Sequence, residues 1–224
     1  TLPSGPSPAP APGVPVSLKS NAQYRFQEGD NRQAIVFMGD VRVEYKQVGV
    51  RADSAVVWTN QQTGQFEVYA RGGVRVSRQE QDSPEDGASL QFSRMFKNMR
   101  ADELYINPGQ ARGLAADAEL RIQRREPARA DTYVVDGKNV YMVNSSSLLV
   151  REGSLSTCSF AKPHYKLWAD RYRIAQGEDN VFLTMWDAGL GIEGWNSPSL
   201  PFLATDLAGE PLFRLDVGSR DRYG

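Results

Sequence analysis

The stretch VFMGDVRVEYKQVGVRADSAVVW, residues 36–58, contains the pattern that the rest of the chain repeats. In its first half the apolar residues Val41, Val43 and Tyr45 alternate with charged residues. Successive side chains of a strand point to opposite faces, so this alternation predicts a strand with one dry face and one solvated face. A turn is expected at residues 47–49, and a second alternating run comes after it. The stretch therefore predicts a pair of strands.

A short triplet within this stretch recurs further along the chain. Arg51-Ala52-Asp53 returns as Arg100-Ala101-Asp102 and, in altered form, as Trp168-Ala169-Asp170. Each copy is expected early in a strand, and Gly-led strands at Gly39 and Gly72 accompany the copies. Short strands with frequent turn signals favour a sandwich, a barrel or a stacked sheet. A repeating strand pair further indicates an all-β fold with strands stacked along one axis.

Glycines occupy the positions at which this pattern places reversals of the chain. Glycine adopts positive φ angles at little cost, and tight turns require such angles. Asp53 and Asp102 stand at equivalent positions of two repeats, and we interpret both as structural residues that cap a turn. The glycines expected at turns are Gly39, Gly49, Gly64, Gly72 and Gly73.

The apolar residues of the alternating strands form one predicted inner face. Such a face either packs against a second sheet as a dry core or forms an apolar trough that is open to a ligand. The alternation is compatible with both arrangements. The residues assigned to the face are Val41, Val43, Tyr45, Val57, Phe66, Val68, Val74, Val76, Leu104, Ile106, Leu120 and Ile122.

The composition and charge of the chain exclude several classes of function. Its 224 residues carry a formal net charge of −1, which argues against a nucleic-acid partner held by phosphate contacts. No apolar run is long enough for a transmembrane helix. The common catalytic motifs are missing, and a single histidine does not support the usual acid–base arrangements. We therefore predict a protein that is not an enzyme and uses no cofactor.

Cys158 and His164 are the only cysteine and histidine of the chain. Two candidate ligands do not make a zinc site, so we predict no metal site. Cys158 has no partner for an internal disulfide. In an exported protein a lone cysteine suggests pairing with another chain or with a missing part of the same chain. The alternative is a buried free thiol.

A local basic cluster lies at and after the end of the strand expected near residue 123. Acidic residues interleave with it, so we favour a solvated strand face and loop over contacts with the phosphates of a glycolipid. The cluster consists of Arg121, Arg124, Arg125 and Arg129, and the interleaved acidic residues are Glu119, Glu126 and Asp131.

Two segments depart from the strand pattern. Residues 1–16, TLPSGPSPAPAPGVPV, consist largely of Pro, Ala, Ser and Gly, and they predict a flexible Pro-rich leader. Such a leader is either the stretch after a cleaved signal sequence or an ordinary tail. Residues 90–99, LQFSRMFKNM, fit helical spacing no better than a strand with a bulge, so we expect a strand or a short turn there.

The repeated sequence motifs resemble those of a known family. The pattern F-x-G-D-V-x-V-x-Y, with V-x-A-D-x-A and Y-A-x-G-G-V-x-V after it, resembles the OstA-like domain of the lipopolysaccharide-transport family that includes LptA, LptC and LptD. Residues 155–158, 165–170 and 195–203 resemble the end of the N-terminal domain of the LptD branch. The chain departs from that branch at residues 159–167, SFAKPHYKL, and at Trp195-Asn196-Ser197.

The resemblance implies a fold, a function and a location. The implied fold is an antiparallel β-jellyroll of stacked strand pairs, folded over like a taco around an open apolar interior. In the family this interior shields the acyl chains of lipid A at the periplasmic face of the outer membrane, and the lipopolysaccharide passes on to a membrane barrel. Residues 17–203 would form this domain. Residues 204–224 would form a linker and the start of a C-terminal barrel that is absent from the chain.

The resemblance also implies partners and residue roles. The inner-face residues would contact lipid acyl chains, and the bridge protein LptA would dock by pairing with an edge strand. The lipoprotein LptE would bind together with the missing barrel, and Cys158 would form a disulfide with that barrel. Pro198 and Pro201 would break the strand ladder at a transfer gate. The alternative for these prolines is an ordinary exit loop.

Two other functions are compatible with the same residues. A structural or adhesive β-sandwich with a filled core has the same alternation of apolar and polar residues. A soluble bridge-type carrier of lipopolysaccharide has the same repeat and lacks the barrel. The three functions differ in whether the inner face opens to a lipid and in whether a membrane barrel continues the chain beyond Gly224.

Overall fold

One antiparallel sheet of 13 strands contains every strand of the described chain. The computed structural model describes residues 16–29, 31–45, 48–60, 62–78, 98–123, 132–144, 146–158, 163–177 and 180–207. The prediction of an all-β antiparallel fold is confirmed. The strands are β1 (Val16–Lys19), β2 (Ala22–Glu28), β3 (Arg32–Tyr45), β4 (Val48–Asn60), β5 (Phe66–Arg78), β6 (Asn98–Asn107), β7 (Arg112–Gln123), β8 (Thr132–Asn144), β9 (Ser147–Ser156), β10 (Tyr165–Gln176), β11 (Val181–Ile192), β12 (Trp195–Asn196) and β13 (Leu200–Asp206), with the 3-10 turn η2 (Pro108–Gln110) between β6 and β7.

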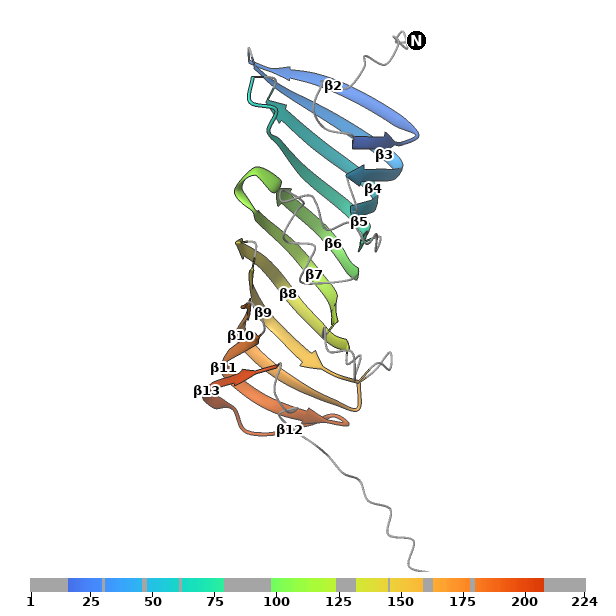
Figure 1. Ribbon diagram of the computed structural model, residues 1–224. Coiled ribbons are helices and arrows are strands. Elements are labelled where there is room, and N and C mark those ends of the chain that lie inside the picture. Colours follow the sequence, from blue (N-terminus) through green and yellow to red (C-terminus); the bar gives the residue numbers. More distant parts are fainter. Residues whose placement is uncertain are drawn as a thin grey trace, which may run out of the picture.

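Neighbours in the sheet are also neighbours in the sequence. From β3 to β11 each strand pairs with the next one, so the sheet is a continuous antiparallel meander. The short strands β1 and β2 both pair with β3, and β12 and β13 both pair with β11. Figure 1 shows the result as a column of strands that runs from the N-terminal strands to the C-terminal strands. The repeat therefore corresponds to strand pairs stacked along one axis.

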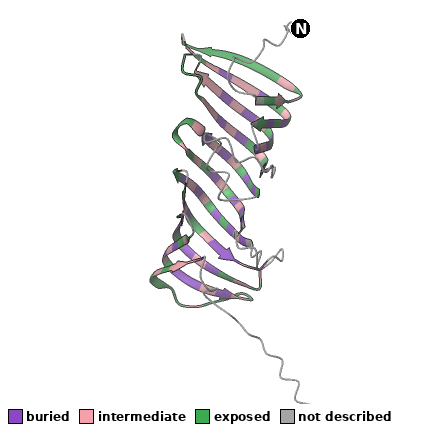
Figure 2. Ribbon diagram, in the orientation of Figure 1, coloured by how far each residue is buried: buried purple, intermediate pink, exposed green. Residues whose placement is uncertain are grey.

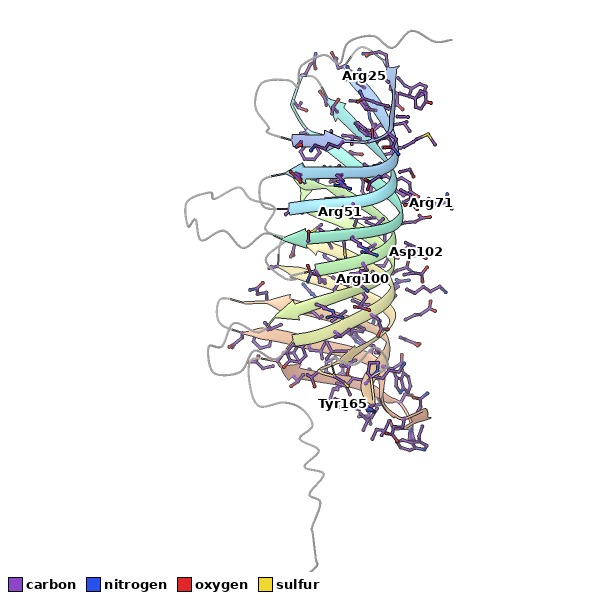
Figure 3. All side chains as sticks on the ribbon, turned by 90° about the vertical axis from the view of Figure 1, so that its right-hand side faces the viewer. Arg25, Arg51, Arg71, Arg100, Asp102 and Tyr165 are labelled. Atoms are coloured by element: carbon purple, nitrogen blue, oxygen red, sulfur yellow. The ribbon has the colours of Figure 1, made fainter. Side chains whose placement is uncertain are left out.

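Each long strand bends near its middle, and the bends line up across the sheet as one row, which we call the bend row. The pairing register is interrupted there, for example between Met38 and Val41 of β3 and between Arg51 and Ser54 of β4. The bend divides each strand from β3 to β11 into two halves, and Figure 3 shows these curved strands from the side. Arm A contains residues 32–38, 54–60, 66–71, 103–107, 112–116, 139–144, 147–151, 171–176 and 181–186, and arm B contains residues 41–45, 48–52, 74–78, 98–101, 118–123, 132–137, 153–156, 165–169 and 188–192.

The repeated triplets mark the bend row. In β4 the exposed Asp53 and its neighbour Ser54 stand between the buried Ala52 and Ala55. Because two consecutive residues face outward at the bend, the alternation shifts by one position there. The apolar residues of both arms therefore face the same inner side. Small side chains fit on the inside of the bend because the two arms converge there. The corresponding alanines of the other triplets, Ala101 and Ala169, are also buried.

The turn positions expected from glycine are wrong in most cases. Gly39, Gly72 and Gly73 lie inside β3 and β5, at the bend row, with φ angles of 78°, 81° and 53°. Gly49 lies within β4, and only Gly64 of this set stands in a connection between strands. A positive φ angle permits a bulge within a strand as well as a reversal, and the sequence alone does not distinguish the two.

The expected turn-capping role of two aspartates is also wrong. Asp53 lies within β4 and Asp102 lies within β6, and neither strand ends there. Both side chains are exposed on the outside of the bend row. Their equivalent positions in the repeat are nevertheless structural, because both come directly after the small residue that occupies the inside of the bend.

The two faces of the sheet differ in burial. The inward side chains of arms A and B belong to one hydrophobic cluster, whereas most outward side chains are exposed or half-buried. Figure 2 shows this difference as an alternation of buried and exposed residues along the strands. In β3 the buried Val41 and Val43 alternate with the exposed Arg42 and Glu44, as predicted.

Several sequence predictions concern residues outside the described ranges. They are the Pro-rich leader up to residue 15, residue 47 of the expected turn, the segment 90–97, the part of the basic cluster within 124–131 (Arg124, Arg125 and Arg129, with Glu126 and Asp131) and the C-terminal residues 208–224. At the border of the segment 90–97, Met99 lies in β6 with 2% of its surface exposed.

Candidate functional site

The inner face predicted from the sequence is formed by both arms. Most of the residues assigned to it are buried, from 0% exposure for Leu120 to 8% for Val68. Phe66 is half-buried and packs against the core cluster. Tyr45 lies in β3, but its side chain is outside the described part of the structure. The buried members are Val41, Val43, Val57, Val68, Val74, Val76, Leu104, Ile106, Leu120 and Ile122.

The C-terminal half of the sheet extends this face, although none of its residues is assigned to the face from the sequence. Val135, Val150, Ile174 and Met185 have exposed fractions of 0% and come from β8, β9, β10 and β11. The same alternation of apolar and polar positions could have identified them. In β9, for example, the buried Leu148 and Val150 stand on either side of a half-buried residue. The inner face thus runs without interruption from β3 to β11.

The inner face is covered by the chain itself, because arm A packs on arm B. Most of its side chains are aliphatic, so the contacts between them are non-directional. A filled core and a path for lipid would use the same surface. The two differ in whether the arms separate.

Tyr172 joins the two arms near the bend row. Its side chain is 0% exposed, and its hydroxyl donates a hydrogen bond shared by the carbonyl oxygens of Asp136, at 2.9 Å, and Ser154, at 3.0 Å. Tyr172 belongs to arm A, and both carbonyls belong to arm B. Burial, with a smaller effect of the Asp136 carboxylate, raises the pKa of Tyr172 well above its usual value of 10.0. The hydroxyl therefore stays protonated and holds the arms together.

Tyr133 forms a second connection between the arms at the C-terminal end. Its hydroxyl donates to the carbonyl oxygen of Leu207 at 3.2 Å. Tyr133 lies in arm B, whereas the backbone N–H of Leu207 bonds to Val181 of arm A at 2.7 Å. Leu207 itself is 5% exposed, so the residue after β13 belongs to the core.

Cys158 lies just after β9 and is buried, with 9% of its surface exposed. It forms no disulfide within the chain. Its Sγ lies 3.7 Å from Nδ1 of His164, and its backbone N–H donates to the hydroxyl of Ser156 at 3.0 Å. Among the described residues no group of three or more His, Cys, Asp or Glu is placed to hold a metal ion. A disulfide from Cys158 to a barrel stays a prediction.

The two prolines of the predicted gate lie at the C-terminal edge of the sheet. Pro198 is exposed in the link between β12 and β13, and Pro201 is exposed within β13. Pro201 stands opposite the bend of β11, between the paired residues on either side of Asp187. Proline lacks a backbone N–H and is tolerated in an edge strand at such a position. The gating role stays a prediction.

Both ends of the sheet expose large apolar side chains beside a strand edge that pairs with no further strand among the described residues. In β2 the exposed fractions are 48% for Tyr24 and 55% for Phe26. At the other end they are 60% for Trp195 and 56% for both Leu200 and Phe202. A free edge offers unpaired N–H and C=O groups to a strand of another sheet. The structure thus has two surfaces suited to strand addition.

Trp168 lies on the outer face of β10 and covers Gly189 of β11. A β-carbon added to Gly189 would overlap the indole ring. The indole Nε1 is buried and has no hydrogen-bond acceptor among the described residues. This tryptophan therefore packs against the neighbouring strand of the sheet.

Within the described ranges there is no helix with the length and apolar character needed to cross a membrane.

No protein-family model and no curated protein sequence matches the chain. Among solved structures, the crystal structure of LptH from Pseudomonas aeruginosa is similar to it; LptH is described as the LptA-homologous periplasmic component of the conserved lipopolysaccharide transport device. The two chains share 12% sequence identity with a TM-score of 0.44. The similarity covers 73% of this chain and 96% of the LptH chain.

Proposed function

We propose that the chain is a lipid-carrying module of lipopolysaccharide transport, whose inner face shields the acyl chains of lipid A. The observation that carries the proposal is a single folded sheet with an apolar inner face from β3 to β11 and, within the described part of the chain, an unpaired strand edge at each end. The sequence motifs around Gly39, Asp53 and Gly72, which resemble the OstA-like domain, support the same function. In this function the chain performs no covalent chemistry.

The physical need for such a module comes from the low solubility of acyl chains in water. Each CH₂ group that leaves water gains about 0.8 kcal/mol, so a lipid with several acyl chains does not cross an aqueous compartment unshielded. An aliphatic face offers contact without directional bonds. A lipid that slides along it exchanges equivalent contacts at each step, and this exchange keeps the barrier to movement low.

Lipid entry requires arm A to separate from arm B, and the bend row is the natural hinge. Non-glycine residues adopt positive φ angles there, including Asp40, Asp117 and Asp187. Among the described residues the hydrogen bonds that join the arms all come from Tyr133 and Tyr172, in the C-terminal half. We therefore place the opening in the N-terminal strands β3–β7, where the described contacts between the arms are apolar.

The finer assignment is to the N-terminal domain of an LptD-type assembly protein. In this assignment residues 17–203 form the jellyroll, LptA docks by strand addition at the β1–β2 edge, and the lipid leaves past Pro198 and Pro201. Cys158 pairs with a cysteine of a barrel later in the chain, LptE binds with that barrel, and the module works at the periplasmic face of the outer membrane. The exposed apolar residues at both edges support docking there.

Photo-crosslinking in cells tests the proposal. A photo-reactive amino acid at Val43, Val68 or Val76 is expected to capture lipopolysaccharide, because these side chains face the interior. Matched controls are Glu44 on β3 and Arg71 on β5, which lie on the same strands and face outward. Adducts at the three inner positions and none at the two controls would establish the lipid path.

A structural or adhesive sandwich with a filled core is the competing function, and the complete burial of Leu120 and Val135 favours it. Protein adducts alone at all three inner positions would establish the filled core and refute the lipid path. The sequence beyond Gly224 separates the two transport roles. Alternating membrane strands with a cysteine near the end identify the LptD type, and their absence identifies a bridge-type carrier.

A further inference from the structure

A row of arginines crosses the outer face of arm B. Arg42 of β3 is the cross-strand partner of Arg51 of β4, Arg51 is the partner of Arg75 of β5, and Arg75 is the partner of Arg100 of β6. All four side chains are exposed. Figure 3 shows Arg51 and Arg100 on the arm that faces the viewer, one above the other, and Arg71 at the margin where the strands bend.

This alignment is unfavourable unless an anion lies against it. Directly opposed residues of neighbouring antiparallel strands have β-carbons about 4.5–5.5 Å apart, and like charges at that spacing destabilise the sheet. Arg42 is neutralised by Asp40, since their side chains are 2.7 Å apart. Among the described residues, Arg51, Arg75 and Arg100 have no ion-pair partner.

The carboxylates on the same face do not cancel this charge. Glu119, the cross-strand partner of Arg100, pairs with Arg121 at 3.4 Å. Asp53 and Asp102 lie two residues beyond Arg51 and Arg100, at the bend row, where they are exposed. Glu44 lies on the far side of Arg42, towards the end of β3. Among the described residues none of these carboxylates forms an ion pair with Arg51, Arg75 or Arg100, so the positive charge is concentrated along this row over β4, β5 and β6.

A groove is present at this place on the outer face. Its volume is about 340 Å³, and its lining includes Arg51, Arg75, Arg100, Arg121, Glu119 and Asn98. Its volume falls within the range of small-molecule sites, roughly 300–1,000 Å³. Guanidinium groups donate paired hydrogen bonds that match the oxygens of a phosphate, so several of them around one groove favour a phosphate over a neutral ligand.

We propose that this arginine groove binds a ligand that carries two or more phosphate groups. Arg51 and Arg100 stand two strands apart, about 10 Å, because neighbouring strands are about 4.8 Å apart. Two phosphates joined by a short sugar or by further phosphates span that distance, and Arg75 between them contacts either one. The site lies outside the folded sheet, so it does not depend on whether the inner face carries lipid.

Calorimetric titration of the whole chain with two probes tests the site. The probes are sodium tripolyphosphate and a glucosamine disaccharide phosphorylated at both ends, without acyl chains. Arg75→Gln is expected to weaken the binding of whichever probe binds by about tenfold, the loss of one charge-assisted contact. Arg71→Gln is the matched control, because Arg71 lies on the same strand but faces Glu103 at 3.6 Å. The control is expected to bind within about twofold of the unchanged chain.

A second readout does not require a ligand. In low-salt buffer Arg75→Gln is expected to raise the melting temperature, because the loss of this one charge removes its repulsion with both Arg51 and Arg100. Added salt is expected to abolish the difference. Arg71→Gln gives no such rise. Tighter binding of the disaccharide assigns the groove to a glycolipid head group, and tighter binding of tripolyphosphate assigns it to inorganic polyphosphate. Binding of neither probe, or equal loss in both variants, overturns the proposal.

Discussion

Gly72 of β5 lies directly against the side chain of Asp53 in the neighbouring strand β4, at the row where both strands bend. A β-carbon added to Gly72 would overlap the Asp53 carboxylate. A similar arrangement occurs in β3, where a β-carbon on Gly39 would lie 2.7 Å from Nδ2 of Asn21. In both cases a short polar side chain occupies the space that the glycine leaves.

Gly72→Ala is therefore expected to destabilise the protein more than Gly73→Ala. Both glycines have positive φ angles, 81° and 53°, which cost an alanine roughly 1–2 kcal/mol. Only Gly72 adds a clash, because no atom lies within 4 Å of a β-carbon placed on Gly73. Denaturant unfolding of the two variants measures the difference. Equal losses would show that Asp53 moves aside without cost.

Ala101 tests the inside of the bend. It is 5% exposed and is the cross-strand partner of Val74, where the two arms converge. Ala101→Leu is expected to lower the free energy of unfolding by about 1–3 kcal/mol, because the extra methyl groups have no space. The control is Ala116→Leu on the outer face of β7, expected to change stability by no more than about 0.5 kcal/mol. A neutral Ala101→Leu variant would mean that the arms separate easily, which would favour lipid entry.

Tyr172→Phe removes the hydrogen bond between the arms and leaves the carbonyl oxygens of Asp136 and Ser154 without this donor. The expected loss in the free energy of unfolding is about 1–3 kcal/mol. Tyr141→Phe is the matched control, since Tyr141 is half-buried on the outer face and its hydroxyl has no hydrogen-bond partner among the described residues. Similar unfolding curves for both variants would contradict a role of Tyr172 in joining the arms.

Tyr172 also predicts a loss of stability at alkaline pH. Its pKa in the folded protein is raised, so the folded chain keeps a proton that the unfolded chain releases near pH 10. Below that pH both states are protonated and the stabilising contact is fully present. Above it the free energy of unfolding falls by up to about 1.4 kcal/mol per pH unit. Unfolding curves measured from about pH 8 to about pH 11 should show a shallower decline in stability for Tyr172→Phe than for the unchanged chain. An unchanged decline would mean that other groups cause the loss of stability.

Which residues share a face follows from the order of residues in each strand. Alternation is a property of each strand, and it correctly separated Val41 and Val43 from Arg42 and Glu44. The repeated triplet also identified equivalent positions in distant strands. It did not determine their geometry, because a glycine or aspartate with a positive φ angle serves a turn and a mid-strand bend equally well.

The register of the strands and the packing of the two arms follow from the folded structure and not from the order of residues in a single strand. The hydrogen-bonded register places Arg51, Arg75 and Arg100 side by side, although they lie far apart in the sequence and belong to no local cluster. It also brings the Tyr172 hydroxyl to carbonyl oxygens of β8 and β9. These relationships depend on pairing between strands and on folding along the bend row. They are non-local, so alternation within one strand does not contain them.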